Sequence, residues 1–520
     1  MKQNKMKIFF GAILLIGAAA FLNSCSQSFL DVSPKGQDLE SNYYSNPDEA
    51  YAGVIAAYGA TNVETGDTYC SPLGPANTAS DDCYCGGGGP SDMYMWQAVN
   101  NMTVLTPANN PSDMWKVPFQ GINYSNIILS RLSGDIPGLT DDVKTRYIAE
   151  VKFLRAYYYF HVLRWYKNVP LFTEPQTSDM ISAATQADPK DVYAQIEKDF
   201  TEAIPDLPPT VTGAELGRAT QGAAKAWLGI TYLYEQKWAD AAKMFNDVNG
   251  TPGGTSQYGY KLLPNYGDVF DPNNRFHAES VFEIQKVSTQ NYGWGDWGNY
   301  KSNVYALMTG PRAYVKIDPS APDYVNGWSF DPITPDLVDA MVVNGVYDPR
   351  YQFTVTNLDS LAATGKCSYG KDQCYAATGY FMSKYTSLAK YTSATGTREL
   401  NFGVDYIEVR LADTYLMEAE ALVMGGGDQA RAAALLNAVR ARVGLPAVAV
   451  SMDAIKKERR LELATEGVRF FDLVRWGDAD KVLNHMENGF SKNFVVGVNE
   501  ILPIPLAELT NTQMVQNPGY

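Results

Sequence analysis

Histidine is scarce in this sequence, and the motifs of several common enzyme classes are absent. The 520 residues include 3 His, so few side chains can shuttle protons near neutral pH. No Gly-x-Ser-x-Gly elbow, His-Glu-x-x-His, phosphate-binding Gly-x-x-x-x-Gly-Lys or EF-hand loop occurs. We therefore expect a protein that is not an enzyme. Glycoside hydrolysis stays open as an alternative, because it needs only two carboxylates and the chain has 57 acidic residues.

Basic residues are also few relative to acidic ones. The chain has 42 Lys and Arg against 57 Asp and Glu, which gives a net charge of −15. Because so anionic a surface repels a polyanion, we expect no nucleic-acid partner. A neutral polar polymer, such as a polysaccharide, is the more suitable ligand.

Cysteine occurs six times and does not show the spacing of a metal site. Cys367 and Cys374 flank a six-residue loop and could form a disulfide. Cys70 could pair with Cys83 or with Cys85, which leaves one thiol over. We predict no metal site, because no histidine lies close to these thiols in sequence.

The first 24 residues have the pattern of a secretory signal peptide. Lysines precede the apolar run IFFGAILLIGAAAFL, which is too short for a comfortable membrane span. Residues 22–25, Leu-Asn-Ser-Cys, resemble a bacterial lipobox, in which the cysteine becomes the lipidated first residue of the mature chain. We therefore expect residues 1–24 to be removed and Cys25 to carry a lipid anchor. An ordinary signal peptide with a cysteine at this position by chance is the alternative.

Helical periodicity is clearest in four stretches, at about 142–166, 188–205, 219–248 and 407–443. The third matches the tetratricopeptide repeat, whose two helices approach closely through bulky and small residues at fixed offsets. The matching positions are Leu228, Gly229, Tyr232, Ala241 and Phe245. We predict a mainly α-helical fold in which tetratricopeptide-like helix pairs form a superhelical scaffold. Unrelated amphipathic helices are the alternative.

Composition shifts between these helices, in residues 61–115 and 250–400. The second segment is rich in Gly, Pro, Asn, Tyr and Trp, with only short strand-like runs such as SVFEIQ. Long irregular segments inside a domain usually carry function. We expect one domain over 25–520, made of a helical N-terminal half (25–250), a loop-rich ligand-binding region (251–400) and a C-terminal helix pair with its following motif (401–520).

The stretch YGWGDWGNY at residues 292–300 gathers aromatic rings on a glycine-rich support. Sugar rings present patches of C–H bonds that stack on Trp or Tyr, while Asp, Asn and Arg bond the hydroxyl groups. Trp294 and Trp297 fall on opposite faces of an extended strand, whereas a turn can bring both to one face. We predict that at least one of them contacts a ligand. Packing of this loop onto the scaffold is the alternative.

A series of motifs in fixed order resembles the SusD/RagB family, the surface glycan-binding lipoproteins of glycan-feeding Gram-negative bacteria. After the lipobox come FLDVSPKGQ, ASDDCYCGGGG, WKVPFQGINYSNIILSRL and AEVKFLRAYYYFHVLRWYKNVPLFTE. The most specific motifs are ERRLELATEGVRFFDLVRWG at 458–477 and the terminal LPIPLAELTNTQMVQNPGY. The resemblance covers nearly the whole chain.

The resemblance implies a fold of four tetratricopeptide-like helix pairs that support irregular loops. It implies a non-catalytic protein on the outer membrane that captures a glycan outside the cell. Such a protein covers a TonB-dependent SusC-like transporter as a lid, and its helical face meets that barrel. A lipoprotein scaffold that binds only proteins is the alternative. Some members bind Ca²⁺; no ligand spacing indicates a calcium site here, with DPNN at 271–274 as a candidate segment.

Ligand residues vary within this family, so only their positions in the fold can be transferred. Those positions, the N-terminal loops and the segment after the third helix pair, hold several aromatic and polar side chains. The predicted ligand-binding residues are Trp96, Tyr292, Trp294, Trp297, Tyr300, Asp81 and Arg312. We expect Trp115 and Trp165 to lie on helices and Trp328 to belong to the core, and we leave these three out.

The C-terminal motif is expected to maintain the fold. Three glutamates recur at i,i+4: Glu458, Glu462 and Glu466. Their carboxylates would repel one another unless cationic side chains form ion pairs with them. The arginines that can supply such bridges are Arg459, Arg460, Arg469 and Arg475.

Overall fold

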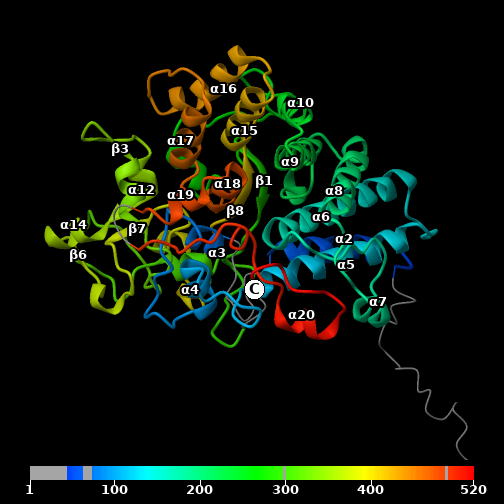
Figure 1. Cartoon of the computed structure of the whole chain (residues 1–520), viewed down its shortest axis with the longest axis horizontal. Coiled ribbons are helices and arrows are strands. Elements are labelled where there is room, and N and C mark those ends of the chain that lie inside the picture. The colour runs from blue at the N-terminus through cyan, green and yellow to red at the C-terminus, as the bar shows by residue number, and fades with distance from the viewer. Residues whose placement is uncertain (1–43, 63–72, 297–299, 487–489) are drawn as a thin grey trace, which may run out of the picture. The chain divides into compact units, whose positions relative to one another are not determined.

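Helices that pack one after another form the scaffold of the protein (Figure 1). The computed structural model describes residues 44–62, 73–296, 300–486 and 490–520. Within it, Asn46–Tyr520 forms one compact unit. The predicted signal peptide, Cys25, Cys70 and Trp297 lie outside the described residues.

The main array joins the N-terminal helices to a C-terminal pair. Its members are α2 (Pro47–Gly59), α5 (Asp113–Leu132), α6 (Asp141–Tyr166), α8 (Pro189–Ala203), α9 (Gln221–Tyr234), α10 (Trp238–Asn249), α15 (Leu411–Met424) and α16 (Gln429–Arg442). Each helix packs against the next in this order, and α10 contacts α15 across the loop-rich region that separates them in sequence. The mainly helical prediction is therefore confirmed.

The pair α9 and α10 shows why small residues are needed between helices. A Cβ atom added at Gly229 would lie 2.8 Å from the ring of Phe245, so only glycine allows this approach. Both residues occupy the positions that the repeat pattern predicted. The stretch 219–248, which the repeat pattern predicted as a helix pair, is two helices, and Gln236 adopts a left-handed backbone, with φ of 60°, between them.

The fourth predicted helix starts later than its periodicity indicated. Residues 407–410 belong to strand β8 (Tyr406–Arg410), and α15 begins at Leu411. β8 pairs in antiparallel fashion with β1 (Ser280–Ile284), which lies in the predicted strand-like run SVFEIQ. This strand pair joins the two ends of the loop-rich region, so its backbone hydrogen bonds outweigh the helical pattern at this point.

Short elements build the loop-rich region and the C-terminal part, and three short helices also lie in the N-terminal half. The small strands form three further antiparallel pairs: β2 (Val315–Lys316) with β6 (Cys367–Ser368), β3 (Val342–Val343) with β4 (Val346–Tyr347), and β5 (Val355–Asn357) with β7 (Tyr380–Met382). The short helices are α3 (Leu73–Thr78), α4 (Tyr94–Asn101), α7 (Ser178–Ser182), α11 (Tyr305–Thr309), α12 (Pro335–Ala340), α13 (Tyr351–Thr354), α14 (Leu358–Ala363), α17 (Met452–Glu462), α18 (Arg469–Trp476), α19 (Ala479–Leu483) and α20 (Leu506–Asn511). Within the described residues, no helix has the length and hydropathy to cross a bilayer.

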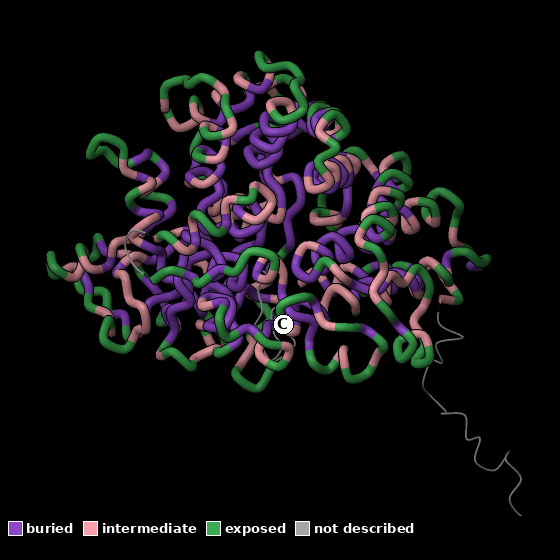
Figure 2. The backbone as a smooth tube through the Cα atoms, in the orientation of Figure 1, coloured by how far each residue is buried: buried purple, intermediate pink, exposed green. Residues whose placement is uncertain are grey.

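A buried network of arginines and carboxylates holds the C-terminal motif in place. Arg350 Nη1 lies 2.9 Å and Arg410 Nη1 lies 2.6 Å from Glu462 carboxylate oxygens, and Arg442 also pairs with Glu462. Figure 2 shows the backbone of β8 and of the first turns of α15 as buried. The structural role expected for the motif agrees with this arrangement.

The basic side chains that form ion pairs with the three glutamates differ from those that the sequence suggested. Glu458, Glu462 and Glu466 are paired by side chains from β8, α16 and the loop-rich region: Arg350, Lys384, Arg410, Arg440 and Arg442. The four arginines of the motif itself turn to other acids, namely Asp81, Asp82, Asp413, Glu420 and Asp472. Sequence proximity was misleading because these partners meet only in the folded chain.

The four described cysteines are free thiols. Cys367 and Cys374 are therefore not bridged, and neither is Cys83 to Cys85. The Cys374 thiol instead donates a hydrogen bond to Ser329 Oγ at 3.3 Å. Cys83 and Cys85 are buried, and burial raises the pKa of both thiols.

Candidate functional site

A buried apolar cluster supports several half-buried rings in the loop-rich region. Its core includes Tyr300, Leu307 and Phe402. Tyr292 and Trp328 pack against this core while keeping part of their rings at the surface. The cluster therefore holds aromatic faces in fixed positions.

Trp294 extends this surface by stacking on Trp328. The two ring centroids are 6.1 Å apart and the ring planes differ by 17°. Trp294 is 45% exposed, which is unusual for so large an apolar side chain. Tyr292, Trp294 and Trp328 together are called the aromatic platform below. The predicted ligand contacts of Tyr292 and Trp294 stay predictions, and Trp297 lies outside the described residues.

The backbone turn that carries Trp294 is fixed by its own polar groups. Asp296 N donates to Gly293 O at 3.1 Å, and Gly293 N donates to Asp296 Oδ2 at 2.7 Å. Asn401 Oδ1 accepts from Tyr292 N at 2.9 Å, and its Nδ2 donates to Tyr292 O at 2.9 Å. The platform is thus tied to the segment near residue 400 rather than to its sequence neighbours alone.

Tyr300 supports the platform from below. It is 1% exposed, and its hydroxyl donates to Gly293 O at 2.9 Å. Its ring meets that of Tyr292 edge to face, with centroids 5.2 Å apart. A bound sugar cannot stack on a ring buried to this degree, so the expected ligand contact of Tyr300 is corrected to a supporting role.

Arg312 forms a polar border beside Trp328. Its Nε donates to Trp328 O at 2.8 Å, and its Nη2 donates to Asp92 Oδ2 at 3.2 Å. The side chain of Arg312 is a quarter exposed and that of Asp92 somewhat more. The sequence pointed to Arg312 but not to Asp92, because nothing in the chain's order links residues 92 and 312.

Trp96 is part of the core and not of the platform. It is fully buried, and its ring meets that of Phe330 edge to face at 5.7 Å. A Cβ atom added at Gly74 would lie 1.9 Å from the Trp96 ring, so the indole fills the space that this glycine leaves. The predicted ligand contact of Trp96 is therefore wrong for this structure.

Asp81 is likewise enclosed, and arginines satisfy its charge. Its carboxylate lies 2.8 Å from Arg460 Nη2 and 2.8 Å from Arg469 Nε. Burial opposes its ionisation, but the charges of Arg460 and Arg469 outweigh this and hold the pKa of Asp81 below its usual value. The predicted contact of Asp81 with sugar hydroxyls is corrected to a structural ion pair.

Trp328 is the ring that sequence reasoning left out. It was assigned to the core, and one face does pack on the core cluster. Trp328 is nevertheless only half-buried, and it also stacks against Trp294. The segment GWSFDP offers no signal that separates these two roles, because both need a large apolar ring.

The segment DPNN at 271–274 forms a turn that satisfies its own polar groups. Asp271 Oδ1 accepts from Asn273 N at 3.0 Å and from Asn273 Nδ2 at 2.9 Å. In the part of the chain that the structure describes, no three His, Cys, Asp or Glu side chains converge as a metal site would require.

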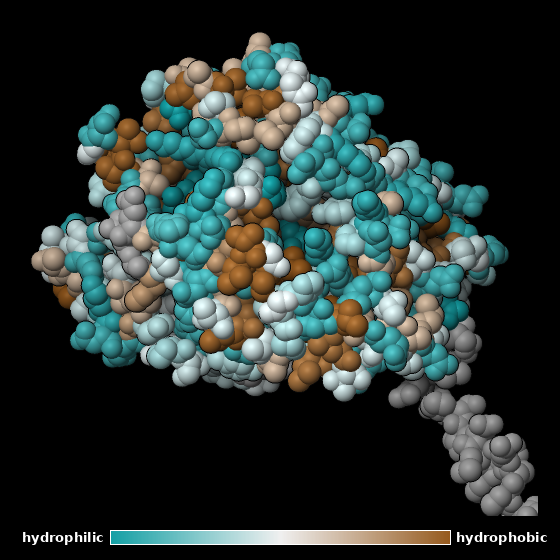
Figure 3. All heavy atoms as spheres, viewed as in Figure 1, coloured by the Kyte–Doolittle hydropathy of each residue, from teal (hydrophilic) through white to brown (hydrophobic). Residues whose placement is uncertain are grey.

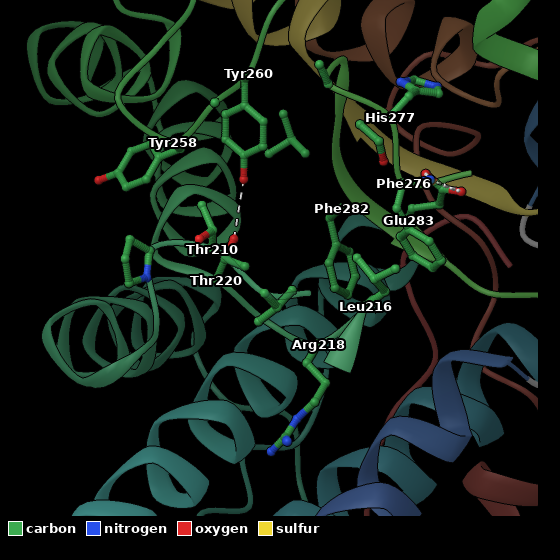
Figure 4. A pocket seen from close by; sticks show the side chains of 17 residues that line it. Thr210, Leu216, Arg218, Thr220, Tyr258, Tyr260, Phe276, His277, Phe282 and Glu283 are labelled. Carbon is green, nitrogen blue, oxygen red and sulfur yellow. Dashed lines mark hydrogen bonds between the residues drawn. The ribbon is translucent and has the colours of Figure 1, made fainter. Parts of the chain in front are cut away.

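A cavity of about 210 Å³ lies between β1 and the turn after α10 (Figure 4). Tyr258 and Tyr260 line one side, and Phe276 and Phe282 line the other. Two of its polar groups are engaged within the protein: Thr220 Oγ1 accepts from Ala223 N and lies 3.3 Å from the Tyr260 hydroxyl.

Known proteins resemble this chain along nearly its whole length. Family models match residues 278–520, described as "SusD family", and residues 29–233, described as "Starch-binding associating with outer membrane". A solved laminarin-binding SusD-like protein is 45% identical, with 92% of this chain and 100% of that chain covered and a TM-score of 0.85. The chain belongs to the SusD-like family.

Two further members of the SusD-like family are more distant. Surface glycan-binding protein A from Bacteroides thetaiotaomicron, solved in complex with laminarihexaose, is 26% identical, with 91% of this chain and 99% of that chain covered and a TM-score of 0.80. A SusD-like protein from Bacteroides ovatus is 25% identical over 515 residues, which cover 93% of this chain and 86% of the relative. The sequence motifs therefore identified the family correctly.

Proposed function

We propose that this SusD-like protein binds laminarin or a similar neutral glucan on the aromatic platform. The observation that carries the proposal is the exposed Trp294 ring, held parallel to Trp328. The name of the 45% identical relative supports the choice of laminarin over other glycans.

The platform suits a sugar for physical reasons. Its rings are held by the core cluster and the Asn401 bridge, so little side-chain entropy is lost when a ligand stacks on them. Arg312 and Asp92 at its border can bond hydroxyl groups. Well-placed aromatic anchors of this kind typically contribute about 2 kcal/mol or more to binding.

The protein's location and its partner are part of the proposed function. The chain is lipid-anchored at Cys25 on the outer membrane, facing outward, and delivers its glycan to a TonB-dependent SusC-like transporter without cleaving it. The family description that mentions the outer membrane supports this location. The motif resemblance described above supports the transporter partner.

Affinity electrophoresis through gels that contain laminarin tests binding and catalysis together. Retardation with no liberated reducing ends is the expected result. Migration equal to that in a plain gel would reject glucan binding, and release of reducing ends would reject a non-catalytic role. Co-purification from outer membranes tests the transporter, since absence of a barrel protein from the purified complex counts against delivery.

A further inference from the structure

A second cleft, of about 270 Å³, lies apart from the platform residues. It is formed by α5, the segment 170–184 that includes α7, and the chain around α20. These three elements appear together in the lower part of Figure 1. None of the residues that line it belongs to the aromatic platform. Its volume lies just below the range of small-molecule pockets, about 300–1,000 Å³, and so suits one small ligand.

Aromatic rings form one wall of this cleft. Trp115 and Phe119 are 4.8 Å apart between centroids, and Phe119 meets Phe172 edge to face at 6.4 Å. Tyr166 buttresses Trp115 from inside the helix array at 5.0 Å. Phe119 and Phe172 are half-buried, so part of their ring surface faces the cleft. In Figure 3 apolar side chains also gather at the surface where α20 lies in Figure 1.

Side-chain amides stand beside these rings. Gln120, Asn123 and Gln176 all line the cleft, as does Thr512, whose hydroxyl donates to Glu508 O at 2.7 Å. Asn123 Oδ1 accepts from Gln176 N at 3.0 Å, which fixes the two amide residues relative to each other. Gln176 Nε2 is buried and has no acceptor among the described residues. A buried amide donor without a partner is costly, and a ligand oxygen would supply the missing acceptor.

The charges at the cleft offset each other. The cleft is lined by one basic residue, Lys116, and one acidic residue, Glu508. Burial raises the pKa of Glu508, while the charge of Lys116 and a hydrogen bond from Trp115 act against this shift. A strongly charged ligand would therefore gain little here. A neutral ligand with several oxygen atoms and an apolar face would match both the amides and the rings.

We propose that this cleft binds one unit of a neutral sugar and is a second glycan site of the chain. The inference goes beyond the proposed function, because it assigns a ligand to residues that the platform does not use. A polysaccharide long enough to reach both sites would gain avidity from the second contact. Short sugars would occupy each site independently.

Saturation-transfer NMR with small sugars tests the cleft directly. The probes are glucose, galactose, mannose, N-acetylglucosamine and laminaribiose, each added to the double variant Trp294→Ala/Trp328→Ala, in which the platform is removed. We expect signal from at least one sugar to persist in this background. Adding Ile181→Trp, which places a large ring at a partly exposed position of the cleft wall, is expected to abolish that signal. Adding Gln120→Ala is expected to weaken binding about fivefold, the loss of one ordinary hydrogen bond.

Matched controls separate the cleft from general effects. Gln352→Ala removes an exposed amide far from the cleft in sequence and is expected to leave the signal unchanged. Absence of signal for all probes in the double variant would overturn the inference, and so would a signal that Ile181→Trp leaves intact. The proposed function is judged separately, by retardation of the unmodified protein in laminarin gels, so either idea can fail while the other holds.

Discussion

The hydroxyl of Tyr300 donates a hydrogen bond to the carbonyl oxygen of Gly293 at 2.9 Å. A fully enclosed ring thereby holds the backbone that presents the exposed ring of Trp294 one residue later. The exposed part of the platform is thus positioned by a buried residue. This division between contact and support leads to the first two predictions.

Removal of the platform rings should weaken glucan binding strongly. We expect Trp294→Ala and Trp328→Ala each to lower laminarin affinity at least tenfold, because each removes stacking area worth about 2 kcal/mol. Isothermal titration with laminarihexaose measures the change. Tyr347→Ala is the control, since Tyr347 is 53% exposed on the β3–β4 hairpin but is not part of the platform. Equal losses in Tyr347→Ala and the platform variants would contradict the assignment.

Tyr300→Phe should weaken binding while leaving the fold intact. The variant keeps the ring in the core cluster but loses the bond to Gly293 O, so the turn that carries Trp294 gains freedom. We expect about a fivefold lower affinity, corresponding to about 1 kcal/mol for one hydrogen bond. A thermal melt should show little change. An unchanged affinity would show that the turn is held by Asp296 and Asn401 alone.

Gly74→Ala should destabilise the protein through Trp96. The added methyl group would overlap the indole, at 1.9 Å from its nearest carbon, in a region that is fully buried. We expect a loss of about 1–3 kcal/mol in the free energy of unfolding, typical of an overpacked core. Denaturant unfolding measures it. Gly59→Ala, where a Cβ atom meets nothing within 4 Å, is the matched control and should be nearly neutral.

Arg410→Met should be strongly destabilising. Arg410 is 1% exposed and pairs with Glu279, Glu462 and Glu466. Its loss leaves buried carboxylates short of a partner, which typically costs about 3–5 kcal/mol. Arg398→Met, on an exposed 3-10 turn, serves as the control. If both variants unfolded at the same denaturant concentration, the network would not stabilise the fold.

Glu283 should make stability fall as pH rises above the acid range. Burial, and then the charge of Asp405, raise the pKa of Glu283 to about 8. Its unfolded pKa is about 4.3, so the folded state holds the extra proton between these values. The free energy of unfolding should therefore decrease from about pH 4 to about pH 8 through this group, because in this range the folded state binds a proton that the unfolded state has already lost.

Glu283→Gln tests this pH effect. The amide cannot ionise but can still donate to Asp405, so the variant should lose part of the slope between the two pKa values. Glu408 and Asp331, whose pKa values burial raises to about 7, contribute slopes of the same sign and remain in both proteins. The comparison is therefore the difference between the two stability curves. Parallel curves across this window would contradict the assignment.

Local patterns predicted much of the scaffold because helix formation depends on nearby residues. The period of α6 and α8 placed both helices within two residues of their observed bounds at each end. The Leu-Gly and Phe positions of α9 and α10 anticipated a contact between Gly229 and Phe245. Residues 407–410 were misassigned because their partner strand lies more than a hundred residues away in sequence.

The sequence by itself determined the family, the helical scaffold and the presence of an aromatic loop, because these follow from motifs and short-range periodicity. Only the tertiary structure decided which aromatic rings are exposed. Trp96 is buried against Gly74, and Trp294 stacks on Trp328. The Asp81 carboxylate forms ion pairs with two arginines. Exposure depends on contacts between residues distant in the chain, and composition carries no record of those contacts.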